Sequence, residues 1–259
     1  MKSLALHSLG RLGLLRPTYR GYERLRAVGR SGGVAEEKLP VPPSRLRIRV
    51  AGTPDLDWFL EGGRLAEETL RQAVARAGTS LEDMSSVLDF GCGCGRVMRR
   101  LAGLPGEVRG SDFDATAVAW CRRNLPFATF VQNELEPPLP FADGEHDLVY
   151  AFSVLTHLPV PIQHAWVDEL ARVVRPGGLL LLSTHGDRYL DRLTAHERAA
   201  FERGEVVVRY EGVAGTNLCT TFHPPAYVRD RLGADLELVD ELPEGARGNP
   251  HQDLFVFRV

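Results

Sequence analysis

Short apolar runs alternate with segments of helical periodicity through the middle of this 259-residue chain. The short runs are too apolar to have one face in water, so they predict the strands of a parallel sheet that helices cover on both faces. Five strands are expected, in the segments SSVLDFG, GEVRGSDFD, ATFVQNE, HDLVYAFSVL and LLLLST. Helices are expected between them in RVMRRLAGL, ATAVAWCRRNL and PIQHAWVDELARVV, the last ended by Pro176-Gly177-Gly178.

The pattern differs on either side of this region. Residues 55–77 predict a helix that is interrupted at Gly62-Gly63. After the fifth strand, EVVVRYEGVAGTNLCTTFHP predicts two further strands and PAYVRDRL predicts a helix. DLELVDEL and HQDLFVFRV then predict a closing antiparallel hairpin at the sheet edge. The expected fold class is α/β, a doubly wound seven-stranded sheet that is mostly parallel with an antiparallel last strand.

The first thirty residues are rich in arginine. Residues 8–30 contain six arginines and one acid, and a linker rich in Gly, Pro and charge follows. We interpret this segment as a helical arm that packs on the body or on a second subunit; a transit peptide or a membrane-surface helix are the alternatives. The expected division is an arm and linker at 1–54 and one domain at 55–259, in which 186–226 form an inserted lid. A homodimer could form through the arm or the lid.

Composition restricts the partners. The net charge of −3 speaks against the basic face of a nucleic-acid-binding protein. No apolar run approaches the length of a membrane span. The four cysteines form no disulfide pattern, so a cytoplasmic location is expected. The pair Cys92-x-Cys94 lacks the second ligand pair of a structural zinc site, and no metal is expected.

The first strand runs into a glycine loop, GCGCG. Its three glycines, in residues 91–95, leave the backbone open to a ligand. The spacing is not that of a dinucleotide site, because Arg96 or Met98 stands at the third glycine position, and no P-loop lysine follows. The second strand ends in Asp112, whose carboxylate can accept hydrogen bonds from both hydroxyls of a ribose. Together these residues predict a nucleoside site at the carboxyl edge of the sheet.

Four motifs carry a resemblance to a known family. VLDFGCGCGR, GSDFD, NELEPPLPFADGEHDLVYAFSVLTHL and LARVVRPGGLLLLS resemble, in this order, the successive motifs of class I S-adenosylmethionine-dependent methyltransferases. The resemblance covers residues 84–185 and extends weakly to QDLFVFR. It implies a Rossmann-like fold, S-adenosylmethionine as the cofactor and S-adenosylhomocysteine as the product. The cofactor-binding residues that it implies are Asp89, Gly91, Cys92, Gly93, Arg96, Asp112, Phe113, Asn133, Glu134, Leu135, Ser153 and Val154.

The resemblance also implies a role for each part of this set. Asp89 and the loop would hold the methionine part together with Ser153 and Val154, while Asp112 would bind the ribose and Phe113 the adenine. The adenine contact departs from the family, because Asn133 stands near where an aspartate is often found. Structural alternatives remain: Asp89 could only anchor the loop, Phe113 could belong to the core, and Gly95 could give space for helix packing.

The expected reaction is methyl transfer by an in-line displacement, in which alignment of the acceptor carries much of the catalysis. We expect the acceptor to be an oxygen or nitrogen atom of a small molecule: a secondary metabolite, a sugar or a lipid-like compound. AFSVL stands where many adenine- and protein-amide-methylating enzymes carry Asn/Asp-Pro-Pro-Tyr/Phe, so a protein or nucleic-acid acceptor is the alternative. A dinucleotide oxidoreductase and a non-catalytic binding subunit are the rivals from other classes.

An oxygen acceptor usually needs a general base, for which histidine is suited at neutral pH. The candidates follow strand ends or the inserted segment: His223 first, then His157 and His185, with His251 last. The acceptor pocket is expected to draw on the helix at 55–77, the end of the fifth strand and the lid. Its candidate residues are Trp58, Phe59, Arg64, Thr184, His185, Tyr189 and Phe222.

Overall fold

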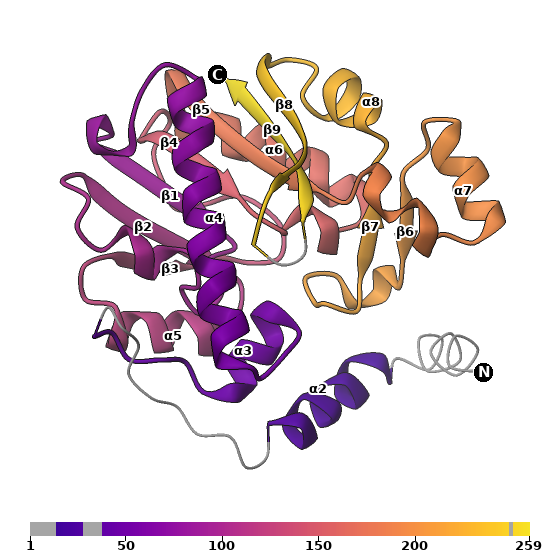
Figure 1. Ribbon diagram of the computed structural model, residues 1–259, viewed down its shortest axis with the longest axis horizontal. Helices are drawn as coiled ribbons and strands as arrows, with labels where there is room; N and C mark the ends of the chain where they lie inside the picture. Colours follow the sequence, from indigo (N-terminus) through magenta and orange to yellow (C-terminus); the bar gives the residue numbers. More distant parts are fainter. Residues whose placement is uncertain (1–13, 28–37, 249–250) are drawn as a thin grey trace.

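One seven-stranded sheet organises the chain (Figure 1). The structure is a computed structural model, and it describes residues 14–27, 38–248 and 251–259. The strand order is β3-β2-β1-β4-β5-β9-β8. The strands that pair in parallel are β1 (Ser86–Phe90), β2 (Glu107–Asp112), β3 (Thr129–Gln132), β4 (His146–Ala151) and β5 (Val174–Thr184). The last strand, β9 (Gln252–Arg258), is antiparallel to β5 and to β8 (Glu237–Ala246), which confirms the predicted fold class.

Helices cover both faces of this sheet because successive strand residues point to opposite sides. Val87 of β1 packs in a core with α4 (Leu56–Arg76) and α5 (Ala115–Asn124). Its neighbour Leu88 packs on the other face, in a core that includes Trp166 of α6 (Val160–Val173). The two cores explain why the predicted strands are almost wholly apolar.

Two predicted elements differ from the structure. Helix α4 is continuous through Gly62 and Gly63, where an interruption was expected. A Cβ at Gly62 would lie 2.8 Å from Nη1 of Arg96, and one at Gly63 would collide with the Arg96 carbonyl oxygen. These glycines therefore allow close packing against the glycine loop instead of ending the helix. The helix expected in RVMRRLAGL is only a 3₁₀ turn, η2 (Met98–Leu101), because Gly103 and Pro105 follow it.

The segment after β5 forms a small unit at one side of the sheet, at the right in Figure 1. Its two predicted strands are present and pair antiparallel, although each has only three residues. Tyr189, Phe201, Val207 and Phe222 form its own small core. Its elements and the helical turns that follow are η4 (Asp187–Arg192), α7 (Ala195–Glu202), β6 (Val207–Arg209), η5 (Glu211–Val213), β7 (Thr220–Phe222), α8 (Pro225–Tyr227) and η6 (Val228–Leu232).

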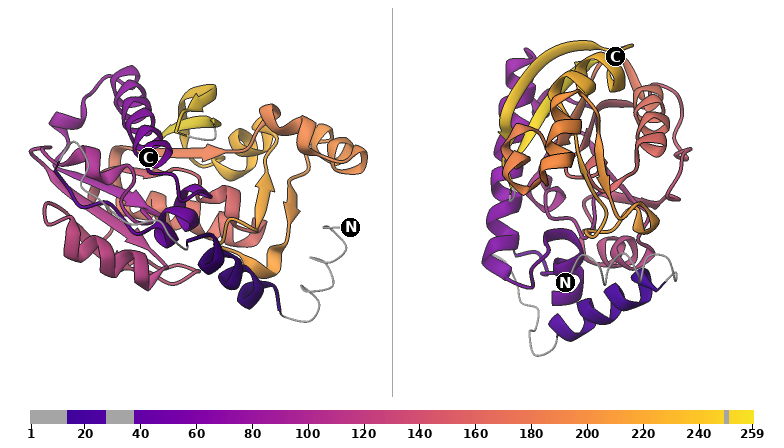
Figure 2. Two further views of the ribbon diagram at one scale, coloured as in Figure 1. Left: turned by 60° about the horizontal axis from the view of Figure 1, so that its bottom comes forward. Right: turned by 90° about the vertical axis from the view of Figure 1, so that its right-hand side faces the viewer.

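The N-terminal segment contributes two helices, α2 (Leu15–Arg26) and α3 (Ser44–Ala51). Helix α2 lies beside α3 and the insertion, where Leu15 packs with Val213 and Cys219 (Figure 2). The remaining parts of the predicted arm and linker, 1–13 and 28–37, lie outside the described residues, and α3 stands in what was expected to be linker. None of the helices in the described part of the chain is long and apolar enough to cross a membrane.

Candidate functional site

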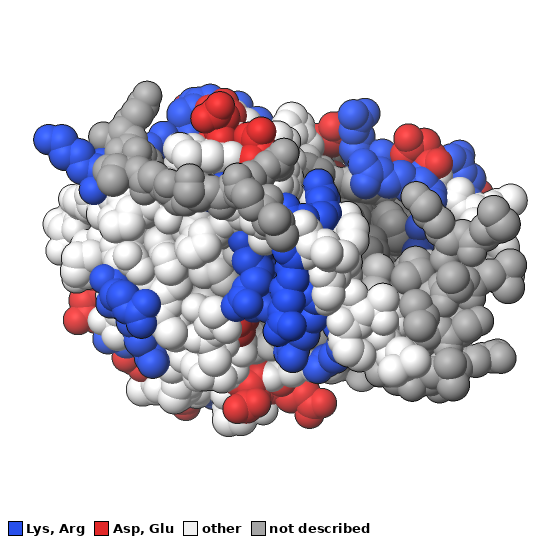
Figure 3. Space-filling model, turned by 90° about the horizontal axis from the view of Figure 1, so that it is seen from below, with Lys and Arg blue, Asp and Glu red and all other residues white. Residues whose placement is uncertain are grey.

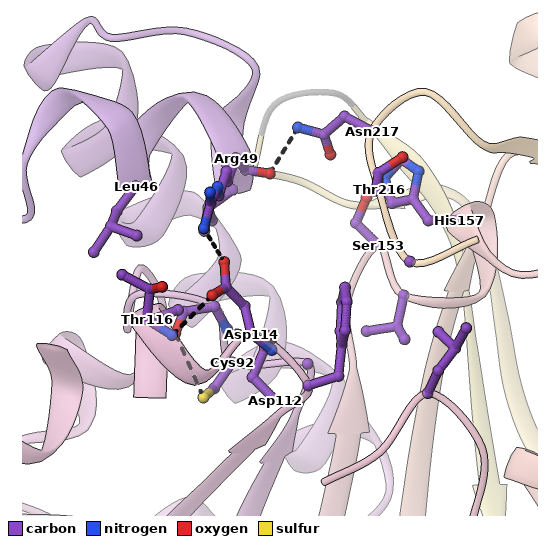
Figure 4. A pocket seen from close by; sticks show the side chains of 18 of the residues that line it. Leu46, Arg49, Cys92, Asp112, Asp114, Thr116, Ser153, His157, Thr216 and Asn217 are labelled. Atoms are coloured by element: carbon purple, nitrogen blue, oxygen red, sulfur yellow. Dashed lines mark hydrogen bonds and ion pairs between the residues drawn. The ribbon is translucent and has the colours of Figure 1, made fainter. Parts of the chain in front are cut away.

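A cavity of 640 Å³ lies at the carboxyl ends of β1, β2, β3 and β4 (Figure 4). Apart from Trp166 of α6, we divide its lining into two parts. The sheet wall consists of the lining residues within 89–97, 112–117, 133–135 and 152–158, which end or follow the four strands. The roof consists of the lining residues within 16–24 of α2, 45–50 of α3 and 213–217 of the insertion. All twelve residues predicted to bind the cofactor line the cavity, in the sheet wall: Asp89, Gly91, Cys92, Gly93, Arg96, Asp112, Phe113, Asn133, Glu134, Leu135, Ser153 and Val154.

The glycine loop of the sheet wall adopts a backbone conformation that other residues rarely reach. Gly91 and Gly93 have φ angles of 76° and 54°. The N–H groups of Gly91 and Cys92 donate to the carbonyl of Ser111 at 2.8 and 3.0 Å, which ties the loop to β2. A Cβ at Gly91 would collide with the side chain of Val154. The loop can therefore lie this close to the residues after β4 only with glycine at position 91.

Asp112 braces the loop and retains acceptor capacity for a ligand. Its Oδ2 accepts the N–H of Gly93 at 2.8 Å, and its Oδ1 accepts the N–H of Asp114 at 2.7 Å. A carboxylate offers about four acceptor positions, so about two remain. Burial raises the pKa of Asp112 to about 6 and that of nearby Asp89 to about 7. Hydroxyl groups that donate to Asp112 would favour its ionised form.

The far end of the sheet wall offers an aromatic face and an unpaired acceptor. Phe113 is 38% exposed, so the alternative that it belongs to the core is wrong. Gly215 of the insertion approaches it so closely that a Cβ there would lie 2.8 Å from the Phe113 ring. Asn133 is 92% buried and donates from Nδ2 to the carbonyl of Glu134 at 2.6 Å. Its Oδ1 has no hydrogen-bond partner in the described structure, which is unfavourable unless a ligand donates to it.

Ser153 is held in an unusual conformation by a closed ring of hydrogen bonds. It has a φ of 61°, a region that residues other than glycine seldom adopt. Its N–H donates to Oγ of Ser183 at 2.7 Å, and that hydroxyl donates to Oε1 of Gln252 at 2.7 Å. Nε2 of Gln252 in turn donates to Oγ of Ser153 at 2.9 Å and to Nε2 of His185 at 3.2 Å. His185 thus supports the Ser153 backbone from behind and does not line the cavity.

Of the predicted base candidates, only His157 lies on the cavity. Its Nδ1 is 2.7 Å from the carbonyl oxygen of Cys219, so Nδ1 carries the hydrogen and Nε2 is left as the basic nitrogen. Burial lowers the pKa of His157, which keeps the ring neutral at pH 7. His223 is fully buried, pairs through Nε2 with Oε1 of Gln163 at 2.9 Å, and lies outside the cavity lining. Burial lowers the pKa of His223 to about 3.

The structure does not bring the predicted acceptor residues to the cavity. Those outside its lining are Trp58, Phe59, Arg64, Thr184, His185, Tyr189 and Phe222. Phe59 is buried in a core cluster with Leu46 of α3 and Ala117 of α5, and Arg64 forms ion pairs along α4. Tyr189 and Phe222 belong to the core of the insertion. Within the described ranges, no three His, Cys, Asp or Glu side chains are grouped as metal ligands.

Most of the roof, which comes from α2, α3 and the insertion, was not predicted from the sequence. Arg49 of α3 donates to Oε2 of Glu23 at 3.1 Å and to Oδ2 of Asp114 at 2.5 Å, so it joins α2 to the end of β2. Nδ2 of Asn217 donates to the carbonyls of Ile48 and Arg49 at 3.2 and 2.7 Å. Figure 4 shows Arg49 with Asp114 on one side and Asn217 on the other. Three segments far apart in sequence thus close the cavity.

Comparisons with known proteins agree with this geometry. Residues 87–178 match the model of a methyltransferase domain family. A probable S-adenosylmethionine-dependent methyltransferase of Mycobacterium tuberculosis is 30% identical over 184 residues, which cover 66% of this chain and 62% of that relative's length. The ubiquinone biosynthesis O-methyltransferase of Thiobacillus denitrificans is 35% identical over 102 residues, 38% of this chain and 43% of that protein.

The fold is also found among solved structures. The glycopeptide N-methyltransferase MtfA complexed with sinefungin matches with a TM-score of 0.52 and 17% identity. The match covers 74% of this chain and 85% of that one. At this identity the likeness shows a shared fold.

Proposed function

This chain belongs to the class I S-adenosylmethionine-dependent methyltransferases, and we propose that it transfers a methyl group to an oxygen or nitrogen atom of a small-molecule acceptor. Bound S-adenosylmethionine would supply an activated methyl group on a sulfonium. The observation that carries the proposal is the convergence of residues from four strand ends on one cavity. The small-molecule acceptor is favoured by the net charge of −3 and by relatives such as the ubiquinone biosynthesis enzyme.

The residues of the sheet wall fit this cofactor. Asp112 has acceptor positions left for the two ribose hydroxyls after it has bound two backbone N–H groups. The unpaired Oδ1 of Asn133 fits the amino group of adenine, next to the exposed ring of Phe113. Asp89 and the glycine loop lie at the end where the methionine part would bind. Asn133 can thus accept a hydrogen bond in the position where the family often has aspartate.

His157 is suited to remove a proton from an oxygen acceptor. Its Nδ1–H is held by a carbonyl of the insertion, so its neutral ring keeps Nε2 as the proton acceptor. The roof covers the same region and would exclude water, which protects the donor from hydrolysis. The chain's own contribution to catalysis is therefore alignment, water exclusion and one base.

The first test is calorimetry with S-adenosylmethionine and S-adenosylhomocysteine. We expect both to bind the wild type with a stoichiometry of one, and Asp112→Ala to weaken binding by about 100-fold, since two charge-assisted hydrogen bonds are lost. Asp168→Asn, which changes an exposed carboxylate on α6, is the matched control and should bind normally. Thermal unfolding would verify that Asp112→Ala is folded.

Either of two outcomes would contradict the proposal. One is that folded wild type binds neither compound, and the other is that it binds NADH in their place. Donor binding with the expected loss in Asp112→Ala justifies a screen of acceptors by mass increase. A screen with small molecules, proteins and RNA would then separate the small-molecule acceptor from the macromolecular alternatives.

A further inference from the structure

The two sides of the cavity carry opposite charge. Among the described lining residues, the sheet wall has four acids and one arginine, whereas the roof has five arginines and one acid. The acids of the sheet wall are Asp89, Asp112, Asp114 and Glu134, and the arginines of the roof are Arg16, Arg20, Arg24, Arg45 and Arg49. A positive sulfonium suits the first surface. The second surface is suited to an anion.

Three of the five roof arginines have no side-chain partner among the residues that the structure describes. Arg49 is neutralised by Glu23 and Asp114. Within residues 14–27, 38–248 and 251–259, Arg16 donates only to the carbonyl of Ala214, at 3.3 Å. Arg20, Arg24 and Arg45 also line the cavity, and the described part of the chain offers their side chains neither a hydrogen bond nor an ion pair.

The spacing of these arginines concentrates their charge along one helix face. Arg16, Arg20 and Arg24 stand four residues apart on α2, so their side chains lie side by side and all three reach the cavity lining. Like charges at this spacing destabilise a helix unless something neutralises them. Figure 3 shows Lys and Arg gathered in the middle of the face seen from below.

Helix α2 is held so that this row stays at the cavity. Leu15 packs into the core that includes Val213, and Glu23 is buried in its ion pair with Arg49. The row therefore cannot turn away into solvent without breaking both contacts. Its charge is directed at the space between roof and sheet wall.

We propose that the acceptor of this enzyme carries a carboxylate or phosphate group, which binds to Arg20 and Arg24 with Arg45 beside them. Guanidinium groups bind both anions through paired, charge-assisted hydrogen bonds. Anchored at the roof, the acceptor would place its methyl-accepting atom toward the sheet wall and His157. This inference rests on the proposed function and adds the chemical class of the substrate.

The test uses two simple anions on the full chain saturated with S-adenosylhomocysteine. Inorganic pyrophosphate represents phosphate groups and succinate represents carboxylates, each titrated by calorimetry at low ionic strength. We expect at least one to bind at one site per chain, and Arg20→Gln/Arg24→Gln to weaken that binding about tenfold or more, because charged hydrogen bonds are lost. The double variant Arg123→Gln/Arg231→Gln is the control, since it removes two exposed arginines outside the cavity lining.

The affinity for S-adenosylhomocysteine separates this inference from the proposed function. We expect it to stay within about twofold in the roof variant, since the donor contacts lie in the sheet wall. An equal loss of donor affinity would mean that the arginines hold the donor's own carboxylate, and would overturn the inference. So would the absence of anion binding, or equal weakening in the control variant. Failure of the wild type to bind the donor at all would instead contradict the proposed function.

Discussion

The sheet wall and the roof offer a ligand two physically different surfaces. The sheet wall uses backbone groups and short side chains, and its key carboxylate, Asp112, is 92% buried and hydrogen-bonded twice to the main chain. The roof uses long arginine side chains on α2 and α3, several of them exposed. A rigid, buried surface is suited to one invariant ligand, whereas long side chains can adapt to a ligand of another shape. We infer that the donor binds to the rigid sheet wall and that the acceptor binds to the adaptable side chains of the roof.

The largest effect is expected at His157, which lies where the two surfaces meet. His157→Gln should reduce turnover of an oxygen acceptor about 100-fold or more, because it removes the only histidine among the described lining residues. The lowered pKa of this histidine keeps its ring neutral at pH 7 and able to accept a proton. Donor affinity should stay within about threefold, since the sheet-wall contacts remain. Turnover would be measured with the acceptor found by the mass screen.

The control for this prediction is His164→Gln. His164 bonds to the hydroxyl of Tyr227 and lies outside the cavity lining, so its loss should leave turnover unchanged. Full activity of His157→Gln would show that the acceptor needs no base, as for an amine with a free lone pair.

The sheet wall was predictable because each of its residues lies within a few positions of a strand end. The parallel sheet then brings these ends to one edge, whatever their separation in sequence. Asp112 ends β2, Asn133 and Ser153 follow β3 and β4, and all three line the same cavity. The spacing of the loop glycines, together with Asp112, indicated that the ligand is a nucleoside. For this surface, local pattern and fold class were sufficient.

The roof could not be predicted in the same way. Asn217 reaches the carbonyls of Ile48 and Arg49 across 169 and 168 positions of sequence, and no local pattern encodes that contact. The aromatic residues expected in the acceptor pocket, such as Tyr189 and Phe222, instead bury one another in the insertion. One signal was present in the sequence: arginines spaced by four at 16, 20 and 24 indicate one charged helix face.

A change of pH is expected to have an intermediate effect. It should change the affinity of the sheet wall for the donor and leave the roof unaffected. Burial raises the pKa of Asp112 to about 6, so in the free protein this carboxyl is largely protonated at pH 5 and ionised at pH 7. Ribose hydroxyls donate best to the ionised form, so donor affinity should increase about tenfold from pH 5 to pH 7. Asp89, whose pKa burial raises to about 7, would extend the increase toward pH 8.

Calorimetry at four pH values, from pH 5 to pH 8, would measure this increase. Binding near pH 6 should also release protons, because the bound donor lowers the pKa of Asp112; the heat would then depend on the buffer. Asp112→Asn should lose most of the dependence between pH 5 and 7, and Asp168→Asn should keep it. A flat profile for the wild type would mean that the carboxyl is already ionised at pH 5 or does not contact the donor.

The smallest effect is expected when the roof is loosened and the sheet wall is left intact. Asn217→Ala removes two hydrogen bonds that join the insertion to α3, at a net cost of about 1 kcal/mol to the closed roof. Donor dissociation should therefore accelerate about fivefold. Association should change little, because the donor enters while the roof is open. Trp166 lines the cavity, so its fluorescence in stopped flow can report both rates.

The control for this prediction is Asn124→Ala, which removes one hydrogen bond to the carbonyl of Trp120 on α5. An unchanged dissociation rate would mean that the roof does not limit donor release, and that the two surfaces act independently.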